Sequence, residues 1–404
     1  MRLDIIGLLS ACSYALDCVE AQFVNVATGH SKRVAYMSVC MAQEFGIAGD
    51  SLQDLAACAL LHDNALTQYI SEEFHNVVDE SSVQSITPKQ LGIHCIYGEE
   101  NLKKYPFKTD VNGVILYHHE NANGTGSFAK KWNEVPLFAR IIHLCDILDS
   151  FCRTKNIDKN TWERAKSYLI KSKGTIFDDE CVDVFFKTFS KESFVLMGRA
   201  NLEKLLLEKV PRTMQEYDNE VCKDIADLFA KIIDYKSEFT SKHSLGVAEC
   251  AAKISRYMGY DDETVYKMYL AGALHDIGKV VIDNDILEKP GRLTSEEFSK
   301  MKNHAEVTYY ILSQINDFED IRDWASYHHE KLDGSGYPFG KKGDELTTNE
   351  RIMACVDIYQ ALTEKRPYKD GMSHEKACEI LGDMAVKGWI DRDIVSVLRK
   401  CFLD

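Results

Sequence analysis

The residues best able to do chemistry in this sequence are histidines that recur at one spacing in both halves of the chain. In each half a histidine is followed 32 residues later by a His-Asp pair, then by another histidine, a His-His pair and an aspartate. Ten of the 13 histidines occupy these positions, so the chain contains the same unit twice. The second-half set is His243, His275, Asp276, His304, His328, His329 and Asp357, and the first-half set is His30, His62, Asp63, His94, His118, His119 and Asp146.

Each set has the composition of a binuclear metal site. Five imidazoles and two carboxylates are suitable ligands for first-row metals, and no cysteine shares the register, which argues against a structural zinc site. A lone histidine on an apolar helix face is more often a core residue, but that explanation fits seven repeated positions poorly. Seven ligands exceed the needs of one ion. We therefore expect two divalent transition metals, bridged in the second half by Asp276.

Two such cations can hydrolyse a phosphodiester. They would clamp the phosphate and lower the pKa of a bridging water, which supplies a hydroxide for in-line displacement. Lys279 follows Asp276 by three residues on the same helix face. We expect it to balance the charge that develops on the phosphate, and the alternative is an ordinary solvated lysine. Asp276 and Lys279 are thus the predicted catalytic residues.

The ligand order and the text around it resemble the HD-GYP family. The second half reads HDIGK at 275–279, ILEKPGRLT at 286–294, HHEKLDGSGYP at 328–338 and RPY at 366–368. The resemblance covers residues 240–370. It implies a metal-dependent phosphodiesterase that converts a bacterial 3′,5′-cyclic dinucleotide to linear dinucleotide or mononucleotides, with iron or manganese bound. Cyclic di-GMP is the first expected substrate and 3′,3′-cyclic GMP-AMP the second.

Substrate contacts are expected outside the ligand set as well. Gly336 would let the backbone approach a ligand closely, and Tyr337 would stack on guanine or, with Pro338, only stiffen the loop. Arg292 and Arg366 are candidates for bidentate contacts or are ordinary ion-pair partners. The predicted substrate-binding set is Lys279, Arg292, Gly336, Tyr337, Pro338 and Arg366. In some relatives a glutamate four residues before the first histidine supports a third metal, but this chain has Phe239 there, which predicts two.

The first half keeps all seven ligand types, so we expect metal binding there too. Leu66 stands where the second half has Lys279, and Ser127-Phe128 stands where it has Tyr337-Pro338. These changes predict reduced or absent diesterase activity. Three interpretations remain open: a metallated scaffold for dimer contacts, a ligand or redox sensor, and a hydrolase of different specificity.

Two other functions would use the same second-half ligands. An HD-fold diiron oxygenase would activate dioxygen at a bridged centre, although oxygenation does not need Lys279 or the GYP loop. A non-catalytic effector would bind the cyclic dinucleotide and signal through partners. Metal-dependent release of linear product separates the phosphodiesterase from both.

The apolar spacing is helical wherever it is clear, and no strand pattern is convincing. We expect an all-α protein of two tandem HD-type helical bundles: a diverged HD-GYP-like domain at 1–195, a helical connector at 196–232 and an HD-GYP phosphodiesterase domain at 233–404. Bundles of this kind build metal sites from side chains on facing helices. The apolar faces of the connector would suit a homodimer.

Composition limits the partners. A net charge of −15 argues against binding a nucleic-acid polymer, and no apolar run approaches the length that crosses a membrane. Thirteen scattered cysteines without framework spacing indicate reduced thiols and a cytoplasmic location. Leu9 to Cys12 resembles a lipoprotein cleavage site, but helical spacing through Leu16 and Val19 favours an amphipathic helix there.

Overall fold

The protein is helical, as expected, and its helices form two compact units. The computed structural model describes residues 1–23, 29–74, 87–152, 159–197, 201–210, 214–235, 243–289, 291–365 and 370–402. The first unit is Asp4–Met214, and the second is Gln215–Asp404 together with Met1–Leu3. The strands in these described ranges are two-residue segments, β1 (Arg2–Leu3) and β2 (Gln215–Glu216), which pair antiparallel within the second unit. The all-α fold class is confirmed.

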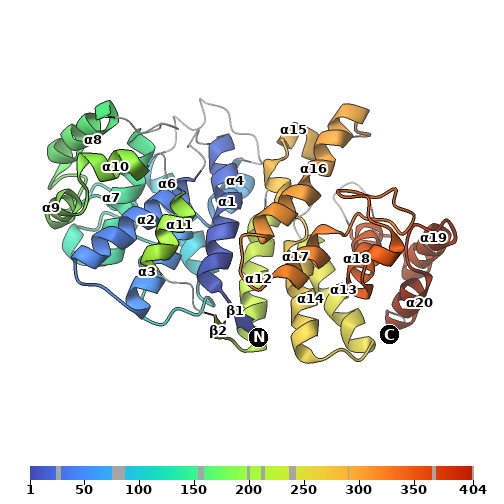
Figure 1. Cartoon of the computed structure of the whole chain (residues 1–404). Helices are drawn as coiled ribbons and strands as arrows, with labels where there is room; N and C mark the ends of the chain where they lie inside the picture. The colour runs from blue at the N-terminus through green and yellow to red at the C-terminus, as the bar shows by residue number, and fades with distance from the viewer. Residues whose placement is uncertain are drawn as a thin grey trace. The chain divides into compact units, whose positions relative to one another are not determined.

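The two units repeat one order of helices, which Figure 1 colours from blue to green in the first and from yellow-green to red in the second. The first unit has α1 (Ile5–Phe23), α2 (His30–Glu44), α3 (Asp50–Leu60), α4 (Leu66–Phe74), α6 (Pro88–Asn101), η1 (Trp132–Glu134), α7 (Leu137–Cys152), α8 (Lys159–Ser172), α9 (Asp179–Thr188), α10 (Lys191–Met197) and α11 (Leu202–Lys209). The second has α12 (Asn219–Asp234), α13 (His243–Tyr257), α14 (Asp262–Leu274), η2 (Ile277–Val281), α15 (Asn284–Leu287), α16 (Ser295–Leu312), α17 (Glu319–Ser326), η3 (Gly343–Glu345), α18 (Thr348–Thr363), α19 (His374–Val386) and α20 (Arg392–Cys401). By histidine register, α2, α3, α6 and α7 correspond to α13, α14, α16 and α18.

Three helices around the second unit's ligands, α14, α16 and α18, begin at N-terminal caps. The side chain of Asp261 accepts a hydrogen bond from the backbone N–H of Thr264 at the start of α14. Capping boxes of Thr294 with Glu297 and of Thr347 with Glu350 start α16 and α18. Each such cap stabilises a helix by about 1 kcal/mol. The caps therefore fix where the ligand-bearing helices start.

Two glycines let these helices approach one another. A Cβ on Gly272 of α14 would lie 2.6 Å from the Cα of Ala248 in α13, and one on Gly278 of η2 would lie 2.0 Å from the carbonyl oxygen of His304 in α16. The Thr308 hydroxyl accepts a hydrogen bond from the Gly278 N–H and donates one to the His275 carbonyl, both at 3.0 Å. The His-Asp turn is thereby held directly against α16.

The segment 196–232, expected as a separate helical connector, is instead divided between the units. α11 packs against α2 of the first unit, whereas α12 packs against α13 and α14 of the second. The apolar face of α12, with Ile225, Phe229 and Ile232, is buried. The boundary falls between Met214 and Gln215 because each helix buries its apolar face in its own unit.

The N-terminal helix predicted from the spacing of Leu16 and Val19 is α1, and it packs on α2, α3 and α4. Cys12, which the lipoprotein interpretation requires at a processed terminus, is 1% exposed in the middle of this helix. All 13 cysteines are buried free thiols. Within the ranges described, no helix has the length and apolar character needed to cross a bilayer.

Candidate metal centres

In the second unit the seven predicted ligands converge on two carboxylates. Around Asp357 of α18, Nε2 of His243 and of His275 lie 3.1 and 3.8 Å from Oδ1, and Nδ1 of His329 lies 3.9 Å from Oδ2. Around Asp276, Nε2 of His275 lies 3.2 Å from Oδ2. Nε2 of His304 and of His328 lie 3.5 and 4.0 Å from its Oδ1. Helices α13, α14, α16 and α18 and the turn after α17 thus bring all seven side chains together.

The position of Asp276 is that of a bridge. Its Oδ2 faces His275, whereas its Oδ1 faces His304 and His328. The ligand atoms form two groups, and within each group they lie within 4.8 Å of one another. One group is His243, His275 and Asp276, and the other is His304, His328 and His329. A carboxylate with one oxygen toward each group is suited to joining two cations.

The histidine rings are oriented by hydrogen bonds from the nitrogen that faces away from the centre. Nδ1 of His275, His304 and His328 each donates to the carbonyl of the residue three positions earlier, at 2.7, 2.7 and 2.6 Å. Nδ1 of His243 lies 3.3 Å from the carboxylate of Glu364. In these four rings Nε2 is left as the inward, lone-pair nitrogen, whereas His329 turns Nδ1 toward Asp357. A hydrogen bond from the outward nitrogen is the usual support for metal-bound histidine.

Buried polar atoms at the centre fit a bound cation. Nε2 of His275 and Oδ1 of Asp276 are buried and have no hydrogen-bond partner in the described part of the chain. Buried polar atoms are normally satisfied, and a metal ion would satisfy both atoms at once. The donor set of imidazole nitrogens and carboxylate oxygens suits a divalent transition metal.

The electrostatics favour the protonation states that bind metal. Burial alone would raise the pKa of Asp276, but His275 and Lys279 bring it well below its usual range. The pKa of Asp357 is lowered in the same way by His243 and His329 against the effect of burial. Burial lowers the pKa of His304 and brings that of His329 to about 3. His243 is the exception, because Asp357 and Glu364 outweigh burial and raise its pKa to about 9.

Lys279 lies where the sequence predicted it. Its Nζ is 2.5 Å from Oδ2 of Asp276, and its side chain is 20% exposed. An ammonium held by a buried carboxylate is not an ordinary solvated lysine, because one side of it faces the metal ligands. It stands at the edge of the centre, with part of its surface open to solvent.

The GYP loop is built around a residue that sequence analysis missed. Glu330 is buried, and its carboxylate accepts hydrogen bonds from the backbone N–H groups of Phe339, Gly340 and Lys341 at 2.7, 3.1 and 3.0 Å. Tyr337 is thereby held with its ring centroid 4.7 Å from that of His329. The available signal was the glutamate that follows the His-His pair in both halves.

The other predicted substrate contacts include Gly336, Arg292 and Arg366. A Cβ on Gly336 would lie 2.4 Å from the backbone nitrogen of Lys331, so the loop folds back closely at this glycine. Arg292 is exposed. Arg366 and Phe239 lie outside the described residues, so the structure places neither.

The first unit assembles its seven ligands in the same pattern. Oδ1 of Asp63 faces Nε2 of His94 at 3.1 Å and of His118 at 3.5 Å, and its Oδ2 faces Nε2 of His62 at 3.5 Å. Asp146 is the second carboxylate of this group. Its Oδ1 lies 3.3 Å from Nε2 of His30 and 3.9 Å from Nε2 of His62, and its Oδ2 lies 3.7 Å from Nδ1 of His119. The repeated register has therefore produced a repeated site.

The surroundings of the first site are different. Leu66 is buried at the place of Lys279. The first unit has a positively charged side chain at a different place, next to His30. There the guanidinium of Arg33 donates to Asp149, and Asp149 also accepts from Nδ1 of His30 at 2.7 Å. Neither Arg33 nor Asp149 was found from the sequence, because their counterparts are Gly246 and Gln360 and only shared positions were compared.

A second addition to the first site is a thiol. The sulfur of Cys95 lies 3.6 Å from Nε2 of His94, and His94, Cys95, His118 and His119 form a group whose ligand atoms lie within 4.8 Å of one another. The repeated histidine spacing did not point to Cys95, because the second unit has Ala305 at the corresponding position.

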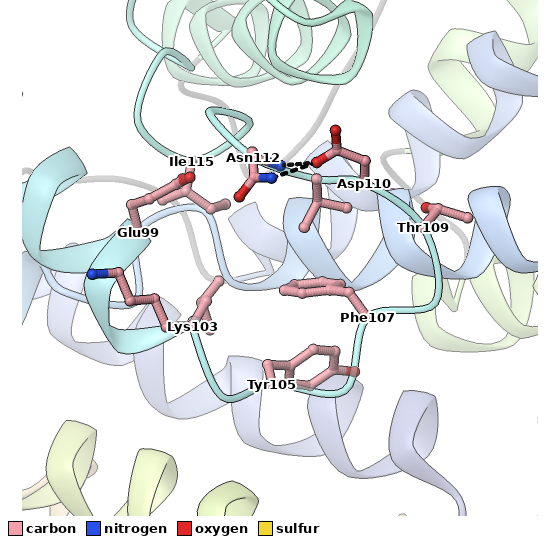
Figure 2. A pocket seen from close by; sticks show the side chains of 10 residues that line it. Glu99, Lys103, Tyr105, Phe107, Thr109, Asp110, Asn112 and Ile115 are labelled. Atoms are coloured by element: carbon pink, nitrogen blue, oxygen red, sulfur yellow. Dashed lines mark hydrogen bonds between the residues drawn. The ribbon is translucent and has the colours of Figure 1, made fainter.

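A hollow of about 350 Å³ also lies in the first unit, and none of the seven ligands lines it. Figure 2 shows it between the end of α6 and the following loop, with Tyr105, Phe107 and Asn112 among its walls. Its Glu99 accepts hydrogen bonds from the backbone of Gly113 and Leu116 at 2.7 and 3.0 Å. The polar lining thus holds the turn that leads to His118 rather than taking part in the metal centre.

A helical bundle that brings histidines and aspartates together around a His-Asp turn defines the class of HD-domain metalloproteins. The sequence matches the HD domain family over residues 21–181 and 227–394. The chain is 30% identical, over 95% of its length and 88% of the relative's, to 3′3′-cGAMP-specific phosphodiesterase 1 of Vibrio cholerae. It belongs to the HD-GYP branch of the HD-domain family.

Two further comparisons agree. The chain is 32% identical to 3′3′-cGAMP-specific phosphodiesterase 3 of Vibrio cholerae over 76% of its length and 66% of the relative's. A solved structure of a cyclic GMP-AMP specific phosphodiesterase from V. cholerae superposes with a TM-score of 0.68, at 23% identity, over 99% of this chain and 97% of that one. The last comparison shows a common fold that spans both units.

Proposed function

We propose that this chain is a metal-dependent phosphodiesterase of 3′,5′-cyclic dinucleotides and that the second unit carries the activity. The observation that carries the proposal is the bridged ligand set with Lys279 on Asp276 at its open edge. The first unit has the ligands without this cation. Named relatives that share most of the chain's length act on a cyclic dinucleotide.

We propose 3′,3′-cyclic GMP-AMP as the first substrate to test, ahead of cyclic di-GMP. This reverses the order expected from the sequence. Relatives named for 3′3′-cGAMP match 95% and 76% of the chain, whereas a cyclic di-GMP phosphodiesterase of Xanthomonas campestris and one of Thermotoga maritima match 44% and 43%. Similarity across both units supports a shared two-unit design with the former group.

The ligands divide between two proposed cation positions. His243 and His275 with Asp357 would hold one, His304, His328 and His329 the other, and Asp276 would join them. Iron or manganese fits this donor set. When bound, the metals supply Lewis-acid activation of the phosphate and of a water molecule.

The chain's own residues supply the rest of the chemistry. The ammonium of Lys279 would meet the non-bridging oxygens of the phosphate and stabilise the extra negative charge of the transition state. Tyr337, held beside His329 by the loop that Glu330 organises, would provide an aromatic face for a base. Buried Nδ1–H donors keep the ligand rings fixed while the substrate changes its charge.

We propose that the first unit binds metal with little diesterase activity. Leu66 offers no charge to a phosphate, and Ser127-Phe128 replaces the tyrosine and proline of the signature loop. Its role is then structural or sensory.

The test uses the metal-loaded full chain with 3′,3′-cyclic GMP-AMP and cyclic di-GMP, separately and in competition, and identifies the products by chromatography. We expect linear dinucleotide or mononucleotides from the mixed nucleotide at a higher kcat/KM than from cyclic di-GMP. Equal inactivity of wild type and His275→Ala on both nucleotides would remove the proposal. A reversed preference would restore cyclic di-GMP as the substrate and leave the proposed chemistry intact.

A further inference from the structure

Cys95 lies inside the ligand cluster of the first unit. Its side chain is fully buried, and its sulfur is 3.6 Å from Nε2 of His94, the ring nitrogen that also faces Asp63 at 3.1 Å. The sulfur and one ring nitrogen each of His94, His118 and His119 lie within 4.8 Å of one another. This is the spacing of atoms that share one metal ion.

Two unpartnered atoms, one in this cluster and one facing it, indicate that a ligand belongs there. Nε2 of His118 and Oδ1 of Asp63 are buried and lack hydrogen-bond partners among the residues described. These two atoms lie 3.5 Å apart and face each other across the cluster. A cation between them would satisfy both. The ring of His118 belongs to the cluster that contains Cys95.

The second unit has no such donor. Ala305 occupies the corresponding position after His304 and is fully buried. The related cluster there consists of His304, His328 and His329 alone. The sulfur is therefore a difference between two otherwise matching ligand sets.

A buried cysteine is more often a small apolar side chain than a ligand, and most of the 13 in this chain fit that description. Cys378 gives a useful contrast, because its sulfur also lies 3.6 Å from a histidine nitrogen, that of His374. No carboxylate or further histidine joins that pair in a metal-type cluster among the described residues. Contact with one histidine is thus not the argument; the convergence of four ligand atoms is.

We infer that Cys95 supplies a thiolate ligand to the metal centre of the first unit, which makes it a mixed sulfur, nitrogen and oxygen site unlike the second. The inference rests on metal binding by the first unit and is independent of hydrolysis by the second. On binding, the thiol loses its proton to solvent and a sulfur–metal bond forms. A soft sulfur donor shifts preference toward zinc or other thiophilic metals.

This ligand also accounts for the diverged chemistry of the first unit. A thiolate adds one negative charge beside the cations, and Leu66 removes the positive charge that Lys279 provides in the second unit. Both changes weaken the attraction of the centre for an anionic phosphodiester. The same changes strengthen retention of the metal, as a structural or sensing site requires.

The experiment uses Co²⁺ as the probe in the full chain, because only thiolate ligation gives a near-ultraviolet sulfur-to-cobalt charge-transfer absorption. We expect this absorption in the wild type, its loss in Cys95→Ala, and its retention in the control Cys378→Ala. We also expect Cys95→Ala to weaken cobalt binding in the first unit at least about tenfold. Diesterase turnover by the second unit should be unchanged and serves as the check that the variant is folded.

Absence of the charge-transfer absorption from the cobalt-loaded wild type would overturn the inference. This measurement on the wild type alone is decisive and does not depend on the folding of a variant. Persistence of the absorption in Cys95→Ala would overturn it as well. If the first unit takes up no cobalt, the absorption is absent and the inference is wrong, whereas loss of hydrolysis with the absorption intact counts only against the proposed function.

Discussion

The first and second units each place five histidines around a matched pair of aspartates, yet the residues at the positions of Lys279, Tyr337 and Pro338 differ. Asp276 holds Lys279, whereas the position equivalent to Lys279 beside Asp63 is a buried leucine. The sulfur of Cys95 has only Ala305 as its counterpart. The two units thus share a candidate metal-ligand set without sharing the residues proposed to act on a substrate.

The ligand sets persist because they are fixed by local geometry. In both units the rings after α3 and α14 are held by a hydrogen bond to the carbonyl three residues earlier, at 2.9 Å for His62 and 2.7 Å for His275. The same holds for His118 and His328, at 2.6 Å each. Positions set by the backbone survive changes of the surrounding side chains, and Lys279 has no such constraint.

Removal of the metals should have the largest effect. A chelator is expected to lower turnover of a cyclic dinucleotide by about 10³-fold or more, since both activation of water and charge stabilisation are lost. Mn²⁺ or Fe²⁺ should restore the activity, measured as product formation per metal bound. The comparison between the units predicts the same restoration in His62→Ala, whose first site is broken. Failure of His62→Ala to recover would show that turnover requires the first site and would contradict catalysis by the second unit alone.

Lys279→Met should lower kcat by about 10²- to 10³-fold, the usual effect of losing one charge-stabilising donor. Metal content should not fall, because Lys279 contacts Asp276 without being a ligand. Metal analysis beside steady-state kinetics checks both statements. Leu66→Lys is the matched change in the first unit, and we expect no gain in turnover because Ser127-Phe128 still replaces the signature loop. Unchanged kcat in Lys279→Met would refute the role given to this cation.

Gly336 and Gly126 occupy matched loops. Alanine at either position should have a similar effect on stability but a different effect on turnover. A Cβ on Gly336 or on Gly126 would lie 2.5 or 2.6 Å from the Cα of Glu330 or Glu120. Both alanine variants are expected to lose about 1–3 kcal/mol of stability from overpacking, measured by denaturant unfolding. Turnover should fall in Gly336→Ala alone, since only its loop carries Tyr337. Equal activity of the two variants would argue that the GYP loop does not contact substrate.

The smallest expected effect is on stability and concerns the buried carboxyl group of Asp234 in the second unit. Burial raises the pKa of Asp234 to about 7, although Ser244 donates to it at 2.6 Å. A pKa raised by folding gives stability that is present below the unfolded value and lost as pH rises through about 7. Asp234→Asn, which cannot ionise, should therefore gain stability relative to wild type between pH 5 and pH 8.

We expect a gain of about 1 kcal/mol, or 2–4 °C in Tm, in thermal unfolding of the chelated proteins. Asp17 makes a similar contact in the first unit, where its two oxygens accept from the N–H groups of Gly29 and Ser31. Asp17→Asn should lower Tm at both pH values, because an amide offers one acceptor oxygen in place of two. A pH-independent difference for Asp234→Asn would contradict the raised pKa.

The sequence predicted the helical class, and its register predicted which histidines and aspartates the fold brings together in each unit, with Lys279 beside Asp276. That these residues bind metal stays a prediction. It did not predict Arg33, Asp149 or Cys95, because a search for shared positions conceals a residue that only one copy has. Glu364 was missed for a different reason: it approaches His243 through the tertiary fold, at 3.3 Å, across more than a hundred residues. The helices of the connector expected at 196–232 pack in different units, and helical periodicity does not tell which unit an apolar face will pack against.

The bridging aspartates offer the most direct test of this division of labour. Asp276→Asn and Asp63→Asn change one charge each at matched positions, and turnover of 3′,3′-cyclic GMP-AMP by the two full-length variants can be compared with wild type at equal metal loading. We expect Asp276→Asn to be inactive and Asp63→Asn to keep wild-type turnover. An inactive Asp63→Asn protein, or an active Asp276→Asn protein, would contradict the assignment of catalysis to the second unit.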